Sequence, residues 1–129
     1  MAEQNSNPPE STESAAPAPQ AALRQSLERL LKVPGVTLAV MSDQNGIPLD
    51  DQDDRGQSLA AQGKVLMEGA ILAGKTMGVG ESKSVAVHDH NGRMLVYTLD
   101  ARYLHISVTK DVKLALVEAA ISKVLATGS

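Results

Sequence analysis

The sequence predicts one α+β domain, in which an antiparallel sheet lies between helices. Apolar residues recur at helical spacing in three segments, and short apolar strands separate these segments. Hairpin signals, Asp43–Gly46 and His90–Gly92, join neighbouring strands through short turns. The order is helix, two strands, helix, three strands, helix (αββαβββα). Two strands, Leu38–Met41 and Met94–Leu99, are apolar on both faces, so we expect the terminal helices on one face and the middle helix on the other.

The first helix and its strand pair occupy the first half of the domain. Leucines at helical spacing predict a helix over residues 23–32, which Pro34 and Gly35 end. The hairpin signal at Asp43–Gly46 then joins two strands. We predict these strands at Thr37–Ser42 and Ile47–Leu49.

A long middle helix and three strands follow. We expect an acidic loop over Asp50–Gln57, an N-cap at Ser58 and a helix to Met77, which the glycines after it terminate. A last helix is predicted from a cap at Asp111, with an apolar face formed by Leu114, Val117, Ile121, Val124 and Leu125. The three strands between these helices are predicted at Ser84–Asp89, Arg93–Leu99 and Tyr103–Val108.

Charge and composition separate a tail from a domain. The 129 residues include twelve Lys or Arg and fifteen Asp or Glu, and three of the acidic residues, Glu3, Glu10 and Glu13, lie within residues 1–22. Residues 1–20 contain four prolines and no Leu, Ile, Val or aromatic residue, so we expect a disordered tail over 1–22. This tail is interpreted as a solubilising extension or a short partner-binding motif. The domain is expected over residues 23–127, with balanced charge.

Composition also excludes several classes of function. A neutral domain with two aromatic residues, Tyr97 and Tyr103, lacks the basic stripe and stacking rings typical of nucleic-acid binding. The absence of cysteine excludes disulfides, thiol catalysis and thiolate metal sites. No apolar run is long enough for membrane insertion, and the N-terminus lacks signal-peptide character. We therefore expect a cytoplasmic protein.

The middle helix is apolar on more sides than a single sheet face can cover. One stripe is expected on the sheet, formed by Leu59, Gly63, Leu66, Ala70, Ala73 and Met77. Ala61, Val65 and Leu72 lie on another side, and Met67 and Ile71 lie between. Only Lys64, Glu68 and Lys75 form a charged strip. This pattern predicts self-association through the helix, and the alternative is a monomer whose loop Asp50–Gln57 covers it.

Three motifs suggest chemistry that their context opposes. Gly69–Thr76 satisfies the phosphate-loop pattern G-x-x-x-x-G-K-[ST], but it lies inside a helical segment and Gly78 follows it. Asp51-x-Asp53-x-Arg55-Gly56 imitates the start of a calcium loop, although Arg55 stands where an oxygen ligand is needed. His88 and His90 have no third histidine near them in sequence, since His105 belongs to another strand. We therefore predict no catalytic, cofactor or metal site.

The same segments, in the same order, resemble a known family. Leu27, Leu30 and Leu31 precede Pro34-Gly35-Val36, and the hairpin Ala39–Leu49 follows. With the Ala/Gly-rich helix Leu59–Met77, the strand Arg93–Leu99 and the closing Asp111-x-x-Leu114-Ala-Leu116-Val117, this order resembles Roadblock-type domains, closest in outline to bacterial MglB-type members. The resemblance covers about residues 23 to 127.

The resemblance implies a Roadblock/profilin-like fold with a five-stranded antiparallel sheet. It also implies a homodimer through the middle helix and the adjacent strand, and a non-enzymatic module that binds and regulates a small Ras-like GTPase, as MglB-type activators do. The alternatives are a dimeric scaffold subunit without a GTPase partner and a nucleotide-hydrolysing enzyme built on Gly69–Thr76. On this reading the partner-binding strip is Lys64, Glu68 and Lys75. The dimer interface is expected at Ala61, Val65, Ile71, Leu72, Ser84 and Ala86.

Overall fold

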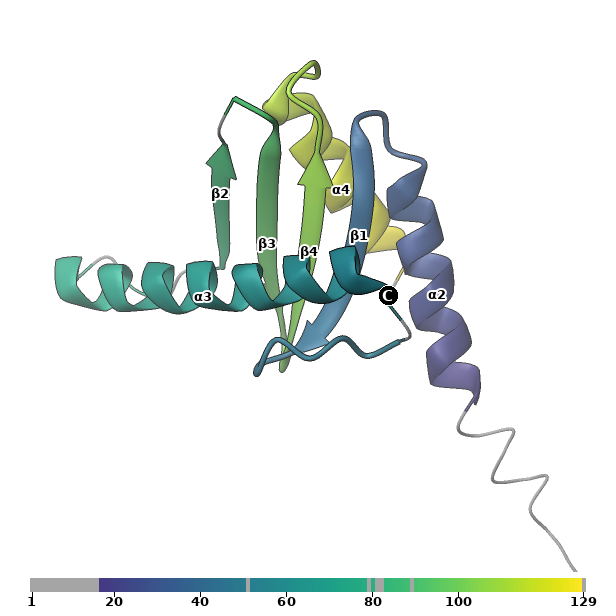
Figure 1. Ribbon diagram of the computed structural model, residues 1–129, viewed down its shortest axis with the longest axis horizontal. Helices are drawn as coiled ribbons and strands as arrows, with labels where there is room; N and C mark the ends of the chain where they lie inside the picture. Colours follow the sequence, from purple (N-terminus) through teal and green to yellow (C-terminus); the bar gives the residue numbers. More distant parts are fainter. Residues whose placement is uncertain (1–16, 51, 79, 81–82, 89, 129) are drawn as a thin grey trace, which may run out of the picture.

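The computed structural model describes residues 17–50, 52–78, 80, 83–88 and 90–128. Within these residues, four strands form one antiparallel sheet in the order β1-β4-β3-β2, and three helices surround it (Figure 1). The helices are α2 (Pro17–Leu31), α3 (Asp54–Met77) and α4 (Leu114–Gly128). The strands are β1 (Val36–Asp43), β2 (Ser84–His88), β3 (Arg93–Leu99) and β4 (Arg102–Val108).

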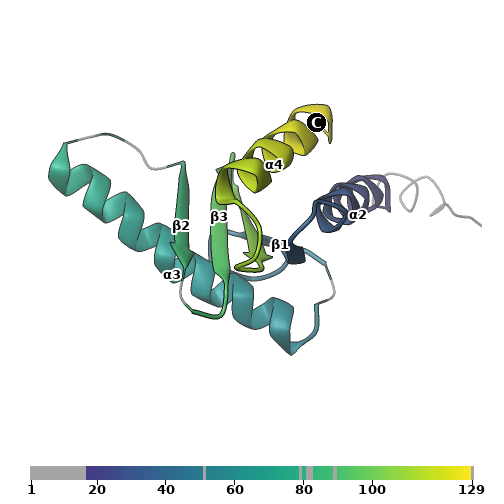
Figure 2. The ribbon, with the colours of Figure 1, turned by 90° about the horizontal axis from the view of Figure 1, so that it is seen from above.

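The sheet is covered on both faces, as the two-sided apolar strands predict. Figure 2 shows α2 and α4 on one face and α3 on the other. Alternate residues of each strand serve the two layers, because successive side chains point to opposite faces. The α2/α4 layer packs on Ala39, Met41, Leu95, Leu104 and Ile106, together with Leu27, Leu30, Val117 and Ile121. The α3 layer packs on Val40, Val96 and Tyr103.

The fifth predicted strand, Ile47–Leu49, is wrong: the described sheet has four strands. The chain still folds back along β1, where the amide of Leu49 donates to the carbonyl of Met41 at 2.9 Å. Only an isolated bridge, between Ser42 and Pro48, forms there. Proline has no amide hydrogen to continue a ladder, and the backbone soon turns toward α3, so the pairing ends after this bridge.

Two helices begin earlier in the chain than the sequence predicts. Helix α2 starts at Pro17, inside the segment 1–22 assigned to a disordered tail, while residues 1–16 lie outside the described residues. Helix α3 starts at Asp54, so most of the expected loop Asp50–Gln57 is helical or caps a helix. Its N-cap is Asp53, whose carboxylate accepts the amide of Gly56 at 3.0 Å, and not Ser58.

The start of α4 and the end of β2 also differ in detail. Helix α4 begins at Leu114, three residues after the predicted cap Asp111, and the carbonyl of Lys113 accepts the amides of Leu116 and Val117. Strand β2 ends at His88, and Asp89, the predicted last residue of that strand, lies outside the described residues.

The face that α3 turns to the sheet is rotated from the predicted stripe. Its buried residues are Gly56, Leu59, Ala60, Gly63, Met67 and Gly74, whose centre lies about 60° from the predicted line at 100° per residue. Ala73 and Met77, both expected on the sheet, are exposed, whereas Met67 is fully buried. A β-carbon at Gly63 would come within 1.9 Å of His105 Nδ1, so this contact fixes the rotation.

Candidate functional site: an interaction surface on helix α3

Helix α3 is longer than the sheet it covers. Its 24 residues span about 36 Å, while the outer strands of a four-stranded sheet lie about 14 Å apart. The C-terminal end of α3 therefore projects past β2, as Figures 1 and 2 both show. Two large apolar side chains near this end are mostly in solvent: Leu72 is 66 % exposed and Met77 is 70 % exposed. Among the described residues, no strand of the same chain lies beneath this projecting end.

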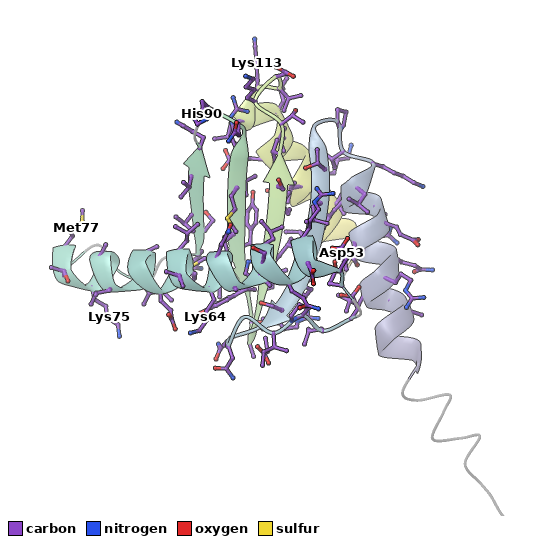
Figure 3. The ribbon with its side chains drawn as sticks, in the orientation of Figure 1. Asp53, Lys64, Lys75, Met77, His90 and Lys113 are labelled. Atoms are coloured by element: carbon purple, nitrogen blue, oxygen red, sulfur yellow. The ribbon has the colours of Figure 1, made fainter. Side chains whose placement is uncertain are left out.

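One side of α3 carries the predicted charged strip. Lys64 and Lys75 point to the same side of the helix in Figure 3, and Lys64 Nζ lies 3.4 Å from Glu68 Oε2. The Lys64 stem also lies against the turn after β1, where a β-carbon at Gly46 would be 3.1 Å from Lys64 Cβ. The structure therefore places the three residues on one side of α3, and the turn after β1 packs against the Lys64 side chain.

The opposite side of α3 borders a groove of about 810 Å³. Its helical wall includes Ala61, Val65 and Leu66, and its floor includes Val87 of β2 and Met94 of β3. Val65 is 65 % exposed and Val87 is 41 % exposed, so the groove leaves apolar surface in contact with water. The Met77 side chain points to this side of α3, away from Lys75 (Figure 3).

Strand β2 forms one end of the described sheet. The amide of Thr98 donates to the carbonyl of Lys83 at 2.9 Å, so residues 85 and 87 also pair by hydrogen bonds with β3. The intervening residues Ser84, Ala86 and His88 then direct their backbone groups outward. An unprotected strand edge of this kind is a template for another strand.

The structure distributes the predicted interface residues unevenly. Ala61, Val65, Leu72, Ser84 and Ala86 are exposed, as an interface in the isolated chain must be. Ile71 is half-buried against the cluster of Met67, Val96 and Tyr103, so part of its side chain already belongs to the chain's own core. The role of these residues in a dimer stays a prediction.

A buried polar pair lies under α3, and the sequence reading assigned it no role. Ser42 and His105 are fully buried, with Ser42 Oγ 2.7 Å from His105 Nε2. The Ser42 hydroxyl donates to the carbonyl of Asp43, so Nε2 is the protonated nitrogen and Nδ1 has no hydrogen-bond partner. Burial lowers the pKa of His105 to about 4. One signal in the sequence could have indicated this pair: His105 is a polar residue between two apolar neighbours of the same strand, Leu104 and Ile106.

The phosphate-loop interpretation of Gly69–Thr76 is wrong. The whole segment lies within α3, so its amides are committed to helical hydrogen bonds and do not form an open cradle. The Thr76 hydroxyl donates to the carbonyl of Leu72 at 2.9 Å, four residues earlier. Gly78 ends the helix in the left-handed conformation, with φ of +70°.

The acidic cluster and the histidines are not assembled into a metal site within the described residues. Asp53 caps α3, Asp50 accepts hydrogen bonds from the Gln52 side chain, and Asp51 lies outside the described residues. His88 and His90 are exposed near the β2–β3 turn, whereas His105 is buried below α3. In the part of the chain that the structure describes, no group of three or more His, Asp or Glu side chains could hold a metal ion. No helix there has the length and apolarity needed to cross a membrane.

Comparison with solved structures decides the fold. The structure superposes on the Roadblock/LC7 domain of Streptomyces avermitilis with a TM-score of 0.71 at 19 % sequence identity, covering 80 % of this chain and 91 % of that one. The chain has a Roadblock-type fold. No protein-family model matches the sequence, and no curated protein matches it either.

Two MglB structures share this Roadblock-type fold. The gliding protein MglB of Thermus thermophilus gives a TM-score of 0.70 at 16 % identity, covering 86 % of this chain and 90 % of that one. MglB of Myxococcus xanthus gives 0.67 at 18 % identity, covering 81 % and 82 %. The Roadblock-type domain described here thus resembles MglB in its fold, at a sequence identity that defines the fold alone.

Proposed function

We propose that the chain is a non-enzymatic, cytoplasmic, homodimeric module that binds and regulates a small Ras-like GTPase. The observation that carries this proposal is the surface of α3: an exposed apolar side and projecting end beside an open strand edge, with a separate charged strip. The apolar side, the projecting end and the strand edge suit contact with a second copy of the chain. The charged strip is left for another protein. The Roadblock-type fold and its likeness to MglB support the choice of a GTPase as that partner.

The apolar part of the surface supports the dimer. Three large apolar side chains on this surface are exposed: Val65, Leu72 and Met77. Burying each of them in an interface would contribute about 1.5–3 kcal/mol of stabilisation. The edge of β2 offers backbone hydrogen bonds beside it. The two β-edges differ here, because the second half of β1 is already covered by Ile47–Leu49.

The charged strip supports binding of a partner through charge complementarity. Lys64, Glu68 and Lys75 lie on the side of α3 away from the groove, so a dimer formed through the groove leaves them accessible. Their ion pair, Lys64 with Glu68, is part-exposed and available for exchange with groups on a partner. Such pairs set specificity and association rate more than affinity.

The test is nucleotide-dependent capture followed by mutation of the strip. The purified full chain is mixed with a lysate of its source organism in the presence of a GTP analogue or of GDP, and retained proteins are identified by mass spectrometry. We expect a small GTPase in one nucleotide state only. The double variant K64E/K75E should lose at least tenfold in affinity for that GTPase while the dimer persists in sedimentation.

A matched control separates this surface from a general charge effect. Lys110 and Lys113 are exposed and lie near the start of α4, and Lys113 is far from the strip in Figure 3. The double variant K110E/K113E makes the same charge change and should bind as the wild type does. Equal binding by both double variants would contradict the strip as the binding surface. Capture of partners that ignore the nucleotide would favour the scaffold function.

A further inference from the structure

We infer that a pocket between α2, α4 and the β3–β4 turn binds a free α-amino acid with an apolar side chain, whose carboxylate meets Arg102 and whose ammonium group meets Asp100. The pocket lies on the face of the sheet opposite α3, so this inference is independent of the proposed dimer and of its GTPase partner. Three observations carry it: an apolar cavity of suitable size, two opposite charges at its mouth, and the left-handed turn that places one of these charges there.

The pocket opens at the end of the sheet where β3 turns into β4, on the face that α2 and α4 cover (Figure 2). Its volume is about 540 Å³, which is within the range of small-molecule sites. Leu30 of α2 and Met41 of β1 are buried and form its floor. Apolar walls come from three elements: Ala22 and Leu23 of α2, Leu99 of β3 and Leu125 of α4. An apolar group that enters this space releases water from these side chains, which favours binding.

Two exposed side chains of opposite charge line the same pocket: Asp100 in the turn and Arg102 at the start of β4. Arg102 pairs with Leu99 across the hairpin, so its side chain lies on the face that α2 and α4 cover. Neither Asp100 nor Arg102 has an ion-pair or hydrogen-bond partner among the described residues. Asp43, opposite Arg102 on β1, accepts two amides of the turn that follows it. Both charges at the pocket are therefore available to a ligand.

The backbone of the β3–β4 turn holds Asp100 in an uncommon conformation. Its φ is +56°, and no other non-glycine residue in the described part of the chain has a positive φ. Glycine adopts this left-handed conformation most readily, whereas Asp and Asn tolerate it better than most other residues do. Glycine would therefore suit the turn by itself. A carboxylate that recognises a ligand gives a reason for Asp at this position.

The two charges decide the class of ligand. An aliphatic carboxylate would be attracted by Arg102 but repelled by Asp100, and an aliphatic amine would meet the reverse situation. An α-amino acid carries both charges on one carbon atom, so a single small molecule can satisfy both side chains. The guanidinium can bind the carboxylate through two parallel hydrogen bonds, and the ammonium group can donate to the Asp100 carboxylate. The apolar side chain of leucine, methionine or phenylalanine then lies on the floor of the pocket.

Calorimetric titration of the full chain tests the class of ligand. We expect saturable binding of at least one of leucine, methionine and phenylalanine, with a Kd below about 1 mM. Analogues that lack one charge, such as isocaproate and isopentylamine for leucine, should bind at least tenfold more weakly, because one charged side chain is then left without its partner. Binding of the carboxylate analogue as tightly as the amino acid would overturn the inference in favour of an aliphatic anion. Failure of all three amino acids to bind would overturn the site.

Matched charge variants test the roles of the two side chains. R102Q should weaken binding of the amino acid at least tenfold, while R55Q, the same change at an exposed arginine of α3, should not alter it. D100N keeps a side chain that tolerates the left-handed turn. It should weaken binding of the amino acid at least tenfold and bind isocaproate more tightly than the wild type does. D111N, at an exposed residue beyond the opposite end of β4, should change neither affinity. Unchanged binding by R102Q and D100N would overturn the assignment.

A bulky side chain at the mouth tests the pocket without a change of charge. Ala22 lines the pocket and Ala21 does not, and both are exposed on α2, so A22W and A21W should keep the wild-type circular dichroism spectrum. A22W should abolish binding, and A21W should retain it. Because the ligand binds the folded chain, the Tm of the wild type and of A21W should rise with the concentration of the amino acid, and that of A22W should not. An equal rise for A22W would place the ligand elsewhere and overturn the inference.

Discussion

At the scale of single residues, the contact between Gly63 and His105 determines how α3 lies on the sheet. The imidazole rises from β4 into the space that a side chain at residue 63 would need. The glycine therefore lets the helix backbone approach the strand, and the helix turns its Met67 side inward to follow. A polar side chain at the centre of an apolar face thus sets a rotation that hydrophobic periodicity does not reveal.

Adding one carbon at this contact should destabilise the fold. G63A forces either the helix or the imidazole to move, which costs about 1–3 kcal/mol of unfolding free energy, as overpacked cores do. G69A adds the same methyl group at a position where a β-carbon meets none of the described atoms within 4 Å, and it should not reduce stability. Urea unfolding of both variants at equal, low protein concentration checks the difference. Equal stabilities for the two would contradict the rotation argued here.

The buried imidazole should also make stability depend on pH. Burial lowers the pKa of His105 to about 4, against an ordinary value of 6.5 in the unfolded chain. Between these values the unfolded chain binds the additional proton, so the free energy of unfolding falls as the pH falls from 6.5 toward 4. The loss approaches about 3 kcal/mol at the lower end.

A non-titrating variant isolates this effect from that of the carboxylates. H105Q removes the ionisable group, and its free energy of unfolding should change less than that of the wild type between pH 7 and 5. Urea titrations at both pH values measure the two changes. If the wild type loses no more stability than H105Q over this interval, the imidazole is not the source of the dependence.

At the scale of elements, the start of α3 distinguishes the predicted cap from the observed one. Asp53 accepts the amide of Gly56, while the Ser58 hydroxyl accepts from the Gln62 side chain at 3.4 Å within the helix. D53A should therefore lower the free energy of unfolding by about 1 kcal/mol, and S58A should change it by a few tenths. Thermal unfolding of the two variants checks this. A larger loss for S58A would place the cap where the sequence predicted it.

The elements that the sequence predicts well are those with long, regular patterns. Helix α3 ends at Met77 and strand β3 spans Arg93–Leu99 as expected, because glycines and a hairpin turn delimit them. The short strand at Ile47–Leu49 was wrong, since three residues containing Pro48 hold only one bridge. The acidic residues before Ser58 led to the prediction of a loop where α3 forms one more turn, because Asp both favours loops and caps helices.

The candidate site was predictable only in part, and the physical reason is geometric. Periodicity placed Lys64, Glu68 and Lys75 on one strip, which the structure reproduces. It could not show that α3 extends beyond β2, because the width of a sheet depends on strand pairing far along the chain. The groove beside Val87 and Met94 arises from the same pairing, so no local pattern signals it.

At the scale of the whole molecule, stability should depend on protein concentration. In the proposed dimer only folded chains associate, so dimer formation is expected to add to the free energy of unfolding by mass action. The apparent Tm of the wild type should rise by several degrees over a hundredfold increase in concentration. Differential scanning calorimetry over this range of concentrations measures the rise. A wild-type Tm that is independent of concentration would contradict dimerisation in this range.

The unequal edges of the sheet have a consequence for how far assembly proceeds. On one side the returning segment Ile47–Leu49 occupies part of β1, and the ladder between β1 and β4 shifts register near Thr37. On the other side β2 is regular. A molecule with two adhesive edges would add copies without limit and grow into a fibre. With β2 as the one regular open edge of the described sheet, the proposed pairing would use up that edge, so we expect the assembly to close at two chains.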